Sequence, residues 1–184
     1  MPGPAAHPDP DHQGRRPHVM TEDEARRVLA ALGRWRAFGS SVGSDRLIQA
    51  GLDALLAGVD CPSIGMLAGL TRQEEPEARE LFDQVLDELG LRYQPPQDPT
   101  AAKWALAYWI AEQMTDGSLD PAVGAYRILA DVAYDLGYPD ELQDLVSCAD
   151  DFDDWDERWS TPTEDLNAEA VTAARELLRN RDRT

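Results

Sequence analysis

Histidine is scarce in this sequence and does not occur after residue 18. His7, His12 and His18 share the first 20 residues with five prolines and almost no apolar side chain, a composition that predicts a disordered segment over residues 1–20. A histidine in such a segment has no scaffold to hold it against a nucleophile or a metal ion. The sequence therefore argues against Ser-His-Asp and Cys-His catalysis and against the H-E-x-x-H zinc site.

Cysteines are few as well, and glycine-rich phosphate loops are absent from the sequence. The two cysteines, Cys61 and Cys148, lie far apart, without C-x-x-C spacing and without basic neighbours. This pattern predicts two free, buried thiols in a reducing compartment, with a disulfide as the alternative, and it gives no support to a zinc site. The chain contains no G-x-x-x-x-G-K-[ST] loop and no G-x-G-x-x-G motif. We therefore expect no catalytic residue, no metal and no cofactor.

Long hydrophobic runs are missing too. No stretch approaches the roughly 20 apolar residues of a membrane span, and the N-terminal segment lacks the apolar core of a secretion signal. We expect a cytoplasmic protein without membrane contact. A single lysine, Lys103, stands against 16 arginines, and alanine, glycine and proline are abundant. That usage indicates a bacterial genome rich in G and C.

Negative charge is what the chain has in excess. The formal net charge is -18, and residues 112–157 alone carry 14 acidic residues against one base, Arg127. A surface of this kind repels nucleic-acid phosphates and anionic lipids and attracts basic proteins. The charge distribution therefore predicts a basic protein partner and no direct binding of nucleic acid.

Helix signals recur from residue 21 onwards. Thr21 and Glu24 form a T-x-x-E capping box, and Asp98-Pro99 and Asp120-Pro121 each place an N-cap before a proline suited to the first helical position. Apolar residues between these signals recur at helical spacing, and no window alternates with the period of a strand. One such segment is lined by Leu47, Ile48, Leu52, Leu55 and Leu56. The pattern predicts an all-α fold of about eight helices with negligible strand, as a single domain over residues 21–180 followed by a tail, 181–184.

The most acidic run follows an apolar stripe at spacings of three and four. This stripe consists of Leu142, Leu145, Val146, Ala149, Phe152, Trp155 and Trp159. The aspartates of the run fall largely off the stripe, which predicts an exposed acidic face on an amphipathic helix. Large aromatics beside clustered charges are typical of interaction surfaces. The predicted partner-binding residues are Asp150, Asp151, Asp153, Asp154, Trp155 and Trp159.

The same run contains D-D-x-x-D, the pattern with which class I terpene synthases hold magnesium diphosphate. The second metal motif of those enzymes, N/D-x-x-S/T-x-x-x-E, is not found, and their fold needs a much longer chain. An EF-hand loop would need a glycine where this run has none. Helical pyrophosphohydrolases pair E-x-x-E with a nearby E-x-x-D, but about sixty residues separate Glu77-Glu80 from Glu141-Asp144. A carboxylate-metal enzyme is thus the weaker alternative.

An aromatic cluster offers a further alternative. Tyrosine and tryptophan side chains gather on two consecutive predicted helices, where such residues usually pack between helices. A small-molecule pocket between these helices is the functional reading of the same pattern. Its predicted lining residues are Trp104, Tyr108, Tyr126 and Tyr134.

Two patches resemble a group of known sequences. The run from Gly51 through Cys61-Pro62-Ser63 to Leu70, and the run Asp135–Leu142, are similar to small acidic helical proteins of actinobacteria and other bacteria that carry no assigned function. The resemblance implies an intracellular, helical, bacterial protein. It brings no catalytic residues to this chain.

These observations favour a non-enzymatic interaction module whose acidic helical face engages a basic partner. An immunity protein or antitoxin, an inhibitor that mimics nucleic-acid charge, and a regulatory adaptor all belong to this class. A helical small-molecule-binding domain that uses the aromatic cluster is the alternative function. The sequence does not specify the oligomeric state.

Overall fold

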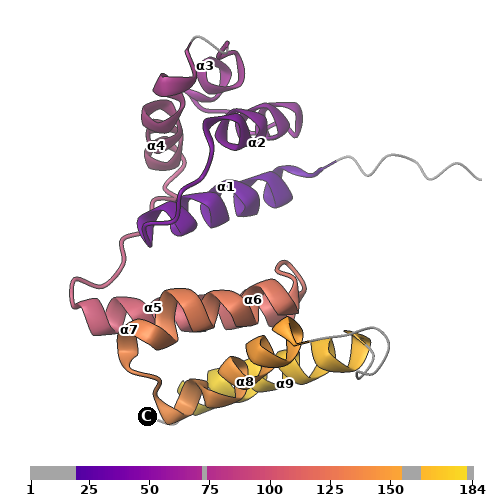
Figure 1. Cartoon of the computed structure of the whole chain (residues 1–184). Coiled ribbons are helices and arrows are strands. Elements are labelled where there is room, and N and C mark those ends of the chain that lie inside the picture. Colours follow the sequence, from indigo (N-terminus) through magenta and orange to yellow (C-terminus); the bar gives the residue numbers. More distant parts are fainter. Residues whose placement is uncertain (1–19, 72–73, 155–162, 182–184) are drawn as a thin grey trace, which may run out of the picture. The chain divides into compact units, whose positions relative to one another are not determined.

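The computed structural model describes residues 20–71, 74–154 and 163–181, and these residues form helices joined by short connections, without a strand (Figure 1). The predicted all-α fold of about eight helices is confirmed. The chain divides into two compact units, one ending at Tyr93 and one beginning at Gln94. The sequence pattern predicted a single domain over residues 21–180. Of the predicted disordered segment 1–20 only Met20 is described, and of the predicted tail 181–184 only Arg181, which belongs to the last helix.

The described residues of the first unit form four α-helices and one 3-10 turn. In chain order they are α1 (Glu22–Ala37), α2 (Ser44–Leu56), α3 (Ile64–Ala68), η1 (Glu75–Glu77) and α4 (Ala78–Glu88). Helix α2 packs against α1, α3 and α4. Its buried Gly51 permits the close approach to α3, because a Cβ there would lie 2.8 Å from Leu67 side-chain atoms.

Helix α1 begins where the sequence predicts. The Thr21 side chain accepts a hydrogen bond from the Glu24 N–H, and the Glu24 carboxylate accepts one from the Thr21 N–H at 2.8 Å. Each bond satisfies a backbone donor that the first turn leaves without a helical partner. The apolar stripe of α2 is only partly used, because Leu47 is buried whereas Leu52, Leu55 and Leu56 are exposed. Three of the apolar residues that line α2 therefore lie outside the core.

The turn before α3 is held by one carboxylate of α4. Glu88 accepts a hydrogen bond from the Ser63 N–H at 2.9 Å and another from the Ser63 hydroxyl at 2.7 Å. These bonds lower the pKa of the Glu88 carboxyl, since they favour its ionised form. Burial, reinforced by a hydrogen bond to Glu88, raises the pKa of the Cys61 thiol beside it. Glu88 thus fastens the start of α3 to α4.

Replacing Glu88 with glutamine is expected to lower the melting temperature at neutral pH, because the amide is a weaker acceptor for the Ser63 donors. The pKa of Glu88 is lower in the folded than in the unfolded chain, so its contribution is present above the unfolded pKa and is lost as the pH falls through the folded pKa. The difference in melting temperature between E88Q and the original chain should therefore shrink at acidic pH. The exposed Glu80 on the same helix supplies the control, E80Q. A pH-independent difference would contradict this role.

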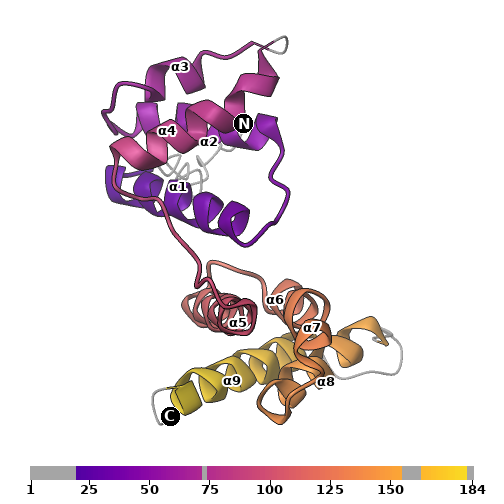
Figure 2. The same ribbon diagram turned by 90° about the vertical axis from the view of Figure 1, so that its left-hand side faces the viewer.

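The second unit holds the remaining helices, with α9 packed against α5 and α8 (Figures 1 and 2). In chain order its elements are α5 (Pro99–Asp116), α6 (Pro121–Ile128), η2 (Leu129–Ala133), α7 (Tyr134–Leu136), η3 (Asp140–Leu142), α8 (Gln143–Asp153) and α9 (Thr163–Arg181). The predicted N-caps are confirmed at both Asp–Pro pairs. Asp98 accepts from the Ala101 N–H, and Asp120 from the Ala122 and Val123 N–H groups.

The segment from α6 to α7 is less regular than its sequence pattern suggests. The spacing of Ile128, Leu129, Val132 and Leu136 is that of one uninterrupted α-helix, but the turn η2 in its middle is a π-helix. Ile128 and Val132 still face the interior and are fully buried. Side-chain periodicity alone does not reveal the turn, since the buried positions keep helical spacing on both sides of it.

Candidate functional site: an acidic pocket between two helices

The predicted acidic run forms the last turn of α8 and its C-cap. Asp150, Asp151, Asp153 and Asp154 are all exposed, whereas Leu142, Leu145, Val146 and Ala149 are buried. The helix has no basic residue in its last turn, so the negative end of the helix dipole lies beside four negative side chains. This arrangement opposes folding. Phe152 is half-buried where the stripe predicted a core position, and the predicted Trp155 and Trp159 lie outside the described residues.

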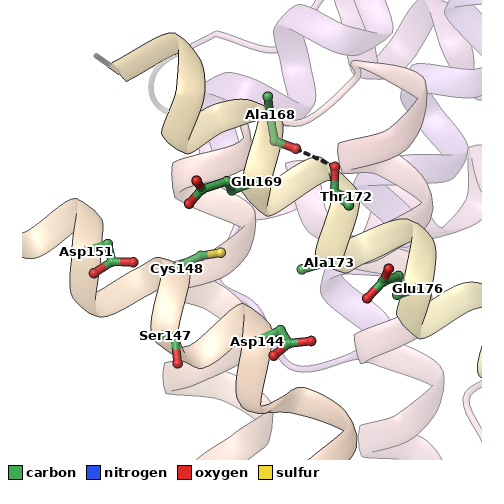
Figure 3. A pocket seen from close by; sticks show the side chains of 9 residues that line it. All are labelled: Asp144, Ser147, Cys148, Asp151, Ala168, Glu169, Thr172, Ala173 and Glu176. Carbon is green, nitrogen blue, oxygen red and sulfur yellow. Dashed lines mark hydrogen bonds between the residues drawn. The ribbon is translucent and has the colours of Figure 1, made fainter. Parts of the chain in front are cut away.

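A pocket of about 420 Å³ lies beside this acidic run, between α8 and α9. Helix α8 contributes residues at helical spacing, and α9 supplies the opposite wall (Figure 3). The acidic side chains of the two helices face the same space, with the Cys148 sulfur between them. The carboxylates in the lining are Asp144, Asp151, Glu169 and Glu176. We call the pocket lined by these four carboxylates the acidic pocket. One of them, Asp151, is also one of the predicted partner-binding residues.

The electrostatics of the pocket act on its thiol. Burial raises the pKa of Cys148, and the nearby carboxylates of Glu169, Asp151 and Asp144 raise it further, because each disfavours a second negative charge. A thiol with a raised pKa stays protonated at neutral pH and is a poor nucleophile. Cys148 and Cys61 are both free, as the sequence predicts, but both are half-buried, which differs from the expected full burial.

The main chemical property of this pocket is the negative charge of its lining. Within the described residues, no three Asp, Glu, His or Cys side chains are placed to hold a metal ion. Four carboxylates around an open pocket instead create a negative potential that extends into solvent. A lysine or arginine side chain entering it would pair with carboxylates from two helices.

The predicted aromatic cluster is spread over three helices. Trp104 and Tyr108 stack on α5 with ring centroids 5.7 Å apart, and the Arg181 guanidinium lies 5.4 Å from the Tyr108 centroid. Tyr126 on α6 and Tyr134 on α7 are exposed. None of these four aromatics lines the pocket between α8 and α9. Whether they form a ligand site stays a prediction.

Sequence reasoning missed the α9 side of the pocket. Glu169 and Glu176 lie seven residues apart, with Thr172 and Ala173 between them, on the flank of the buried stripe of Ala170, Ala174 and Leu177. This spacing places them on one face of a helix, and it was the one feature of the sequence that could have indicated this wall of the pocket. It does not say which helix the face meets, so the convergence with α8 required the structure.

Alkylation of Cys148 tests the pocket's potential without any partner. In a C61S background, we expect slow reaction with iodoacetamide at neutral pH, because the raised pKa keeps the thiolate fraction low. Neutralising Asp151 and Glu169 as D151N and E169Q should speed the reaction at neutral pH and move its pH profile to lower pH. The control D150N removes one exposed charge outside the pocket lining. An unchanged profile in the double variant would show that the carboxylates do not act on the thiol.

Comparison with known protein families, curated proteins and solved structures finds no match for this chain. Among the described helices, none is both long enough and apolar enough to cross a membrane.

Proposed function

We propose that this protein is a non-enzymatic interaction module whose acidic surface around α8 binds a basic protein partner. The observation that carries the proposal is the convergence of carboxylates from two helices, Asp144 and Asp151 from α8 and Glu169 and Glu176 from α9, around one open pocket. The exposed aspartates at the end of α8 extend this negative surface. Immunity proteins, inhibitors and regulatory adaptors that bind basic proteins act through surfaces of this kind.

The acidic side chains are placed where they favour binding of a basic partner and disfavour folding. Like charges on facing helices repel one another, and aspartates at a helix C-terminus oppose the helix dipole, so the surface weakens the fold that carries it. The same field accelerates the encounter with a positively charged protein and disfavours acidic competitors. Phosphate backbones are repelled, so the proposal includes no direct contact with nucleic acid.

The end of α8 offers a first test. We expect the variant D150N/D151N/D153N/D154N to keep its fold and to gain slightly in stability, by a few tenths of a kcal/mol for each charge, because repulsion and the dipole conflict are relieved. Its association with a polylysine peptide should be slower at low salt. The difference should shrink at high salt, where charges are screened beyond a few ångströms.

A matched control removes the same number of charges from the first unit. The exposed residues available for it are Asp45, Asp60, Glu77 and Glu80, as D45N/D60N/E77Q/E80Q. Stopped-flow fluorescence with a labelled peptide gives the association rates, and thermal unfolding gives the stability. A large drop in the melting temperature of the α8 variant would show that its carboxylates are structural. Equal rates for the original chain and the α8 variant at low salt would contradict binding at this surface.

A further inference from the structure

Three exposed tyrosines lie on or directly after the continuous segment α6–η2–α7. Tyr126, Tyr134 and Tyr138 expose 63%, 70% and 46% of their surface. Val123, before Tyr126, and Ala130, between Tyr126 and Tyr134, are exposed as well. Tyr134 and Tyr138 meet edge to face, with ring centroids 6.4 Å apart. We call Val123, Tyr126, Ala130, Tyr134 and Tyr138 the tyrosine face. Surface aromatics grouped in this way are typical of binding surfaces.

The π-turn places two of these tyrosines on nearly the same side of the segment. Tyr126 and Tyr134 are eight residues apart, so in a regular α-helix they would point about 80° apart. The π-turn Leu129–Ala133 takes up one extra residue, which reduces the offset to about 20°. Lys103 of α5 holds the turn, because its Nζ donates to the Asp131 backbone oxygen at 2.6 Å and pairs with an Asp135 carboxylate oxygen at 2.6 Å.

The third ring is placed at a cost to the backbone. Tyr138 has φ +57°, and it follows Gly137 at φ +75°, so two consecutive residues adopt the left-handed conformation. Glycine takes this conformation without strain, whereas a bulky L residue does not. The Tyr138 N–H donates to the Ala133 carbonyl at 2.8 Å, which closes the end of the segment. A tyrosine at a position that favours glycine indicates that its ring serves a purpose other than stability.

We propose that the tyrosine face is the docking surface for an arginine-bearing segment of the basic partner; this inference rests on the proposed function. Four acidic residues, Asp131, Asp135, Asp140 and Glu141, lie on or directly after this segment, and Asp140 and Glu141 are exposed. They outnumber Arg127 and Lys103, which pair with Asp131 and Asp135. This charge selects a cationic occupant over an anionic lipid surface or a second copy of the same acidic chain.

Arginine fits this face better than lysine. Its planar guanidinium stacks on an aromatic ring and still donates in the plane to carboxylates. Within the described residues the chain makes this contact itself, with guanidinium carbons 4.3 Å, 5.6 Å and 5.4 Å from ring centroids. Those pairs are Arg34 with Tyr93, Arg36 with Phe82 and Arg181 with Tyr108. An arginine of the partner would make the same contact with Tyr126 or Tyr134.

The test compares polyarginine and polylysine peptides of equal length, titrated by calorimetry at low and high salt. The original chain should bind polyarginine more tightly than polylysine. In Y126S/Y134S the polyarginine affinity should fall about two- to fivefold for each ring, with a much smaller change for polylysine. L56S, which removes an exposed apolar side chain of α2, is the control and should keep the preference. The helical circular-dichroism signal verifies that each variant is folded.

Tyr138 is tested separately by Y138G. Because glycine relieves the left-handed strain, the melting temperature should rise while the preference for polyarginine weakens. A lower melting temperature would overturn the place of Tyr138 in the face. Equal affinities of the original chain for the two peptides, or an unchanged ratio in Y126S/Y134S, would overturn the inference and leave the acidic-surface proposal standing. Failure of both peptides to bind at low salt would contradict both proposals.

Discussion

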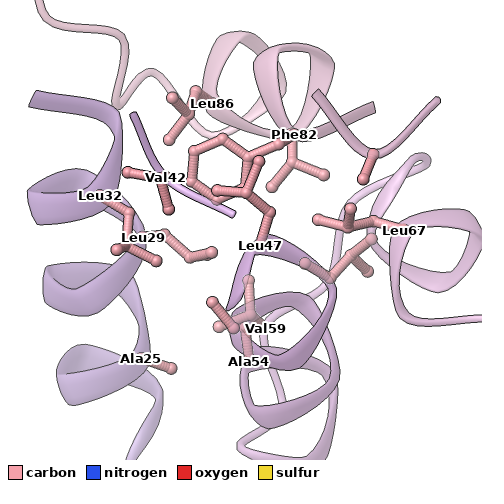
Figure 4. Packing of buried hydrophobic residues seen from close by; sticks show 14 residues of the cluster. Ala25, Leu29, Leu32, Val42, Leu47, Ala54, Val59, Leu67, Phe82 and Leu86 are labelled. Atoms are coloured by element: carbon pink, nitrogen blue, oxygen red, sulfur yellow. The ribbon is translucent and has the colours of Figure 1, made fainter. Parts of the chain in front are cut away.

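Replacing Phe82 with alanine is expected to lower the free energy of unfolding of the first unit by about 3–5 kcal/mol. Phe82 is fully buried on α4, and Figure 4 shows its ring among side chains from several helices, Leu47 and Leu86 among them. Alanine loses the transfer free energy of the ring and leaves a cavity that close-packed neighbours fill only in part. The guanidinium of Arg36, 5.6 Å from the ring centroid, loses its aromatic contact as well.

Hydrogen exchange of the α1, α2 and α4 amides measures this loss where it occurs. The matched control is L56A, because Leu56 is also apolar but 75% of its surface is exposed. L56A should change stability by no more than about 0.5 kcal/mol. If F82A lost less than about 1 kcal/mol, Phe82 would not be the central core residue that the structure describes.

Local signals in the sequence predicted the helix starts well. The capping box of Thr21 and Glu24 and the N-caps Asp98 and Asp120 form as expected, because each involves residues within three positions of one another. Such contacts depend little on how distant helices pack. For the same reason, the all-α fold followed from spacing and helix-end residues alone.

Signals that depend on packing were less reliable. The apolar residues that line α2 extend beyond the face that the helix buries, since Leu47 is buried whereas Leu52, Leu55 and Leu56 are exposed. Phe152 is the last residue of its stripe that the structure describes, and it is half-buried, so F152A should cost less than F82A. The π-turn was missed because helical spacing continues on both sides of it.

The candidate site was predicted only in part. Exposure of the α8 aspartates follows from their position off the apolar stripe. The acidic pocket depends on the pairing of α8 with α9, and Glu169 lies eighteen residues beyond Asp151 in the chain. One sequence does not specify such pairings, because many amphipathic faces are compatible with one another.

Peptide binding by an acidic-pocket variant tests the proposed function most directly. The variant D144N/D151N/E169Q/E176Q removes the four carboxylates that converge between α8 and α9. Calorimetry with polylysine at low salt should show affinity reduced by about tenfold or more, since each partly exposed pair is worth several tenths of a kcal/mol. D45N/D60N/E77Q/E80Q, with the same net charge, should lose much less. Equal loss in the two variants, or no loss in the pocket variant, would contradict the acidic pocket as the binding surface.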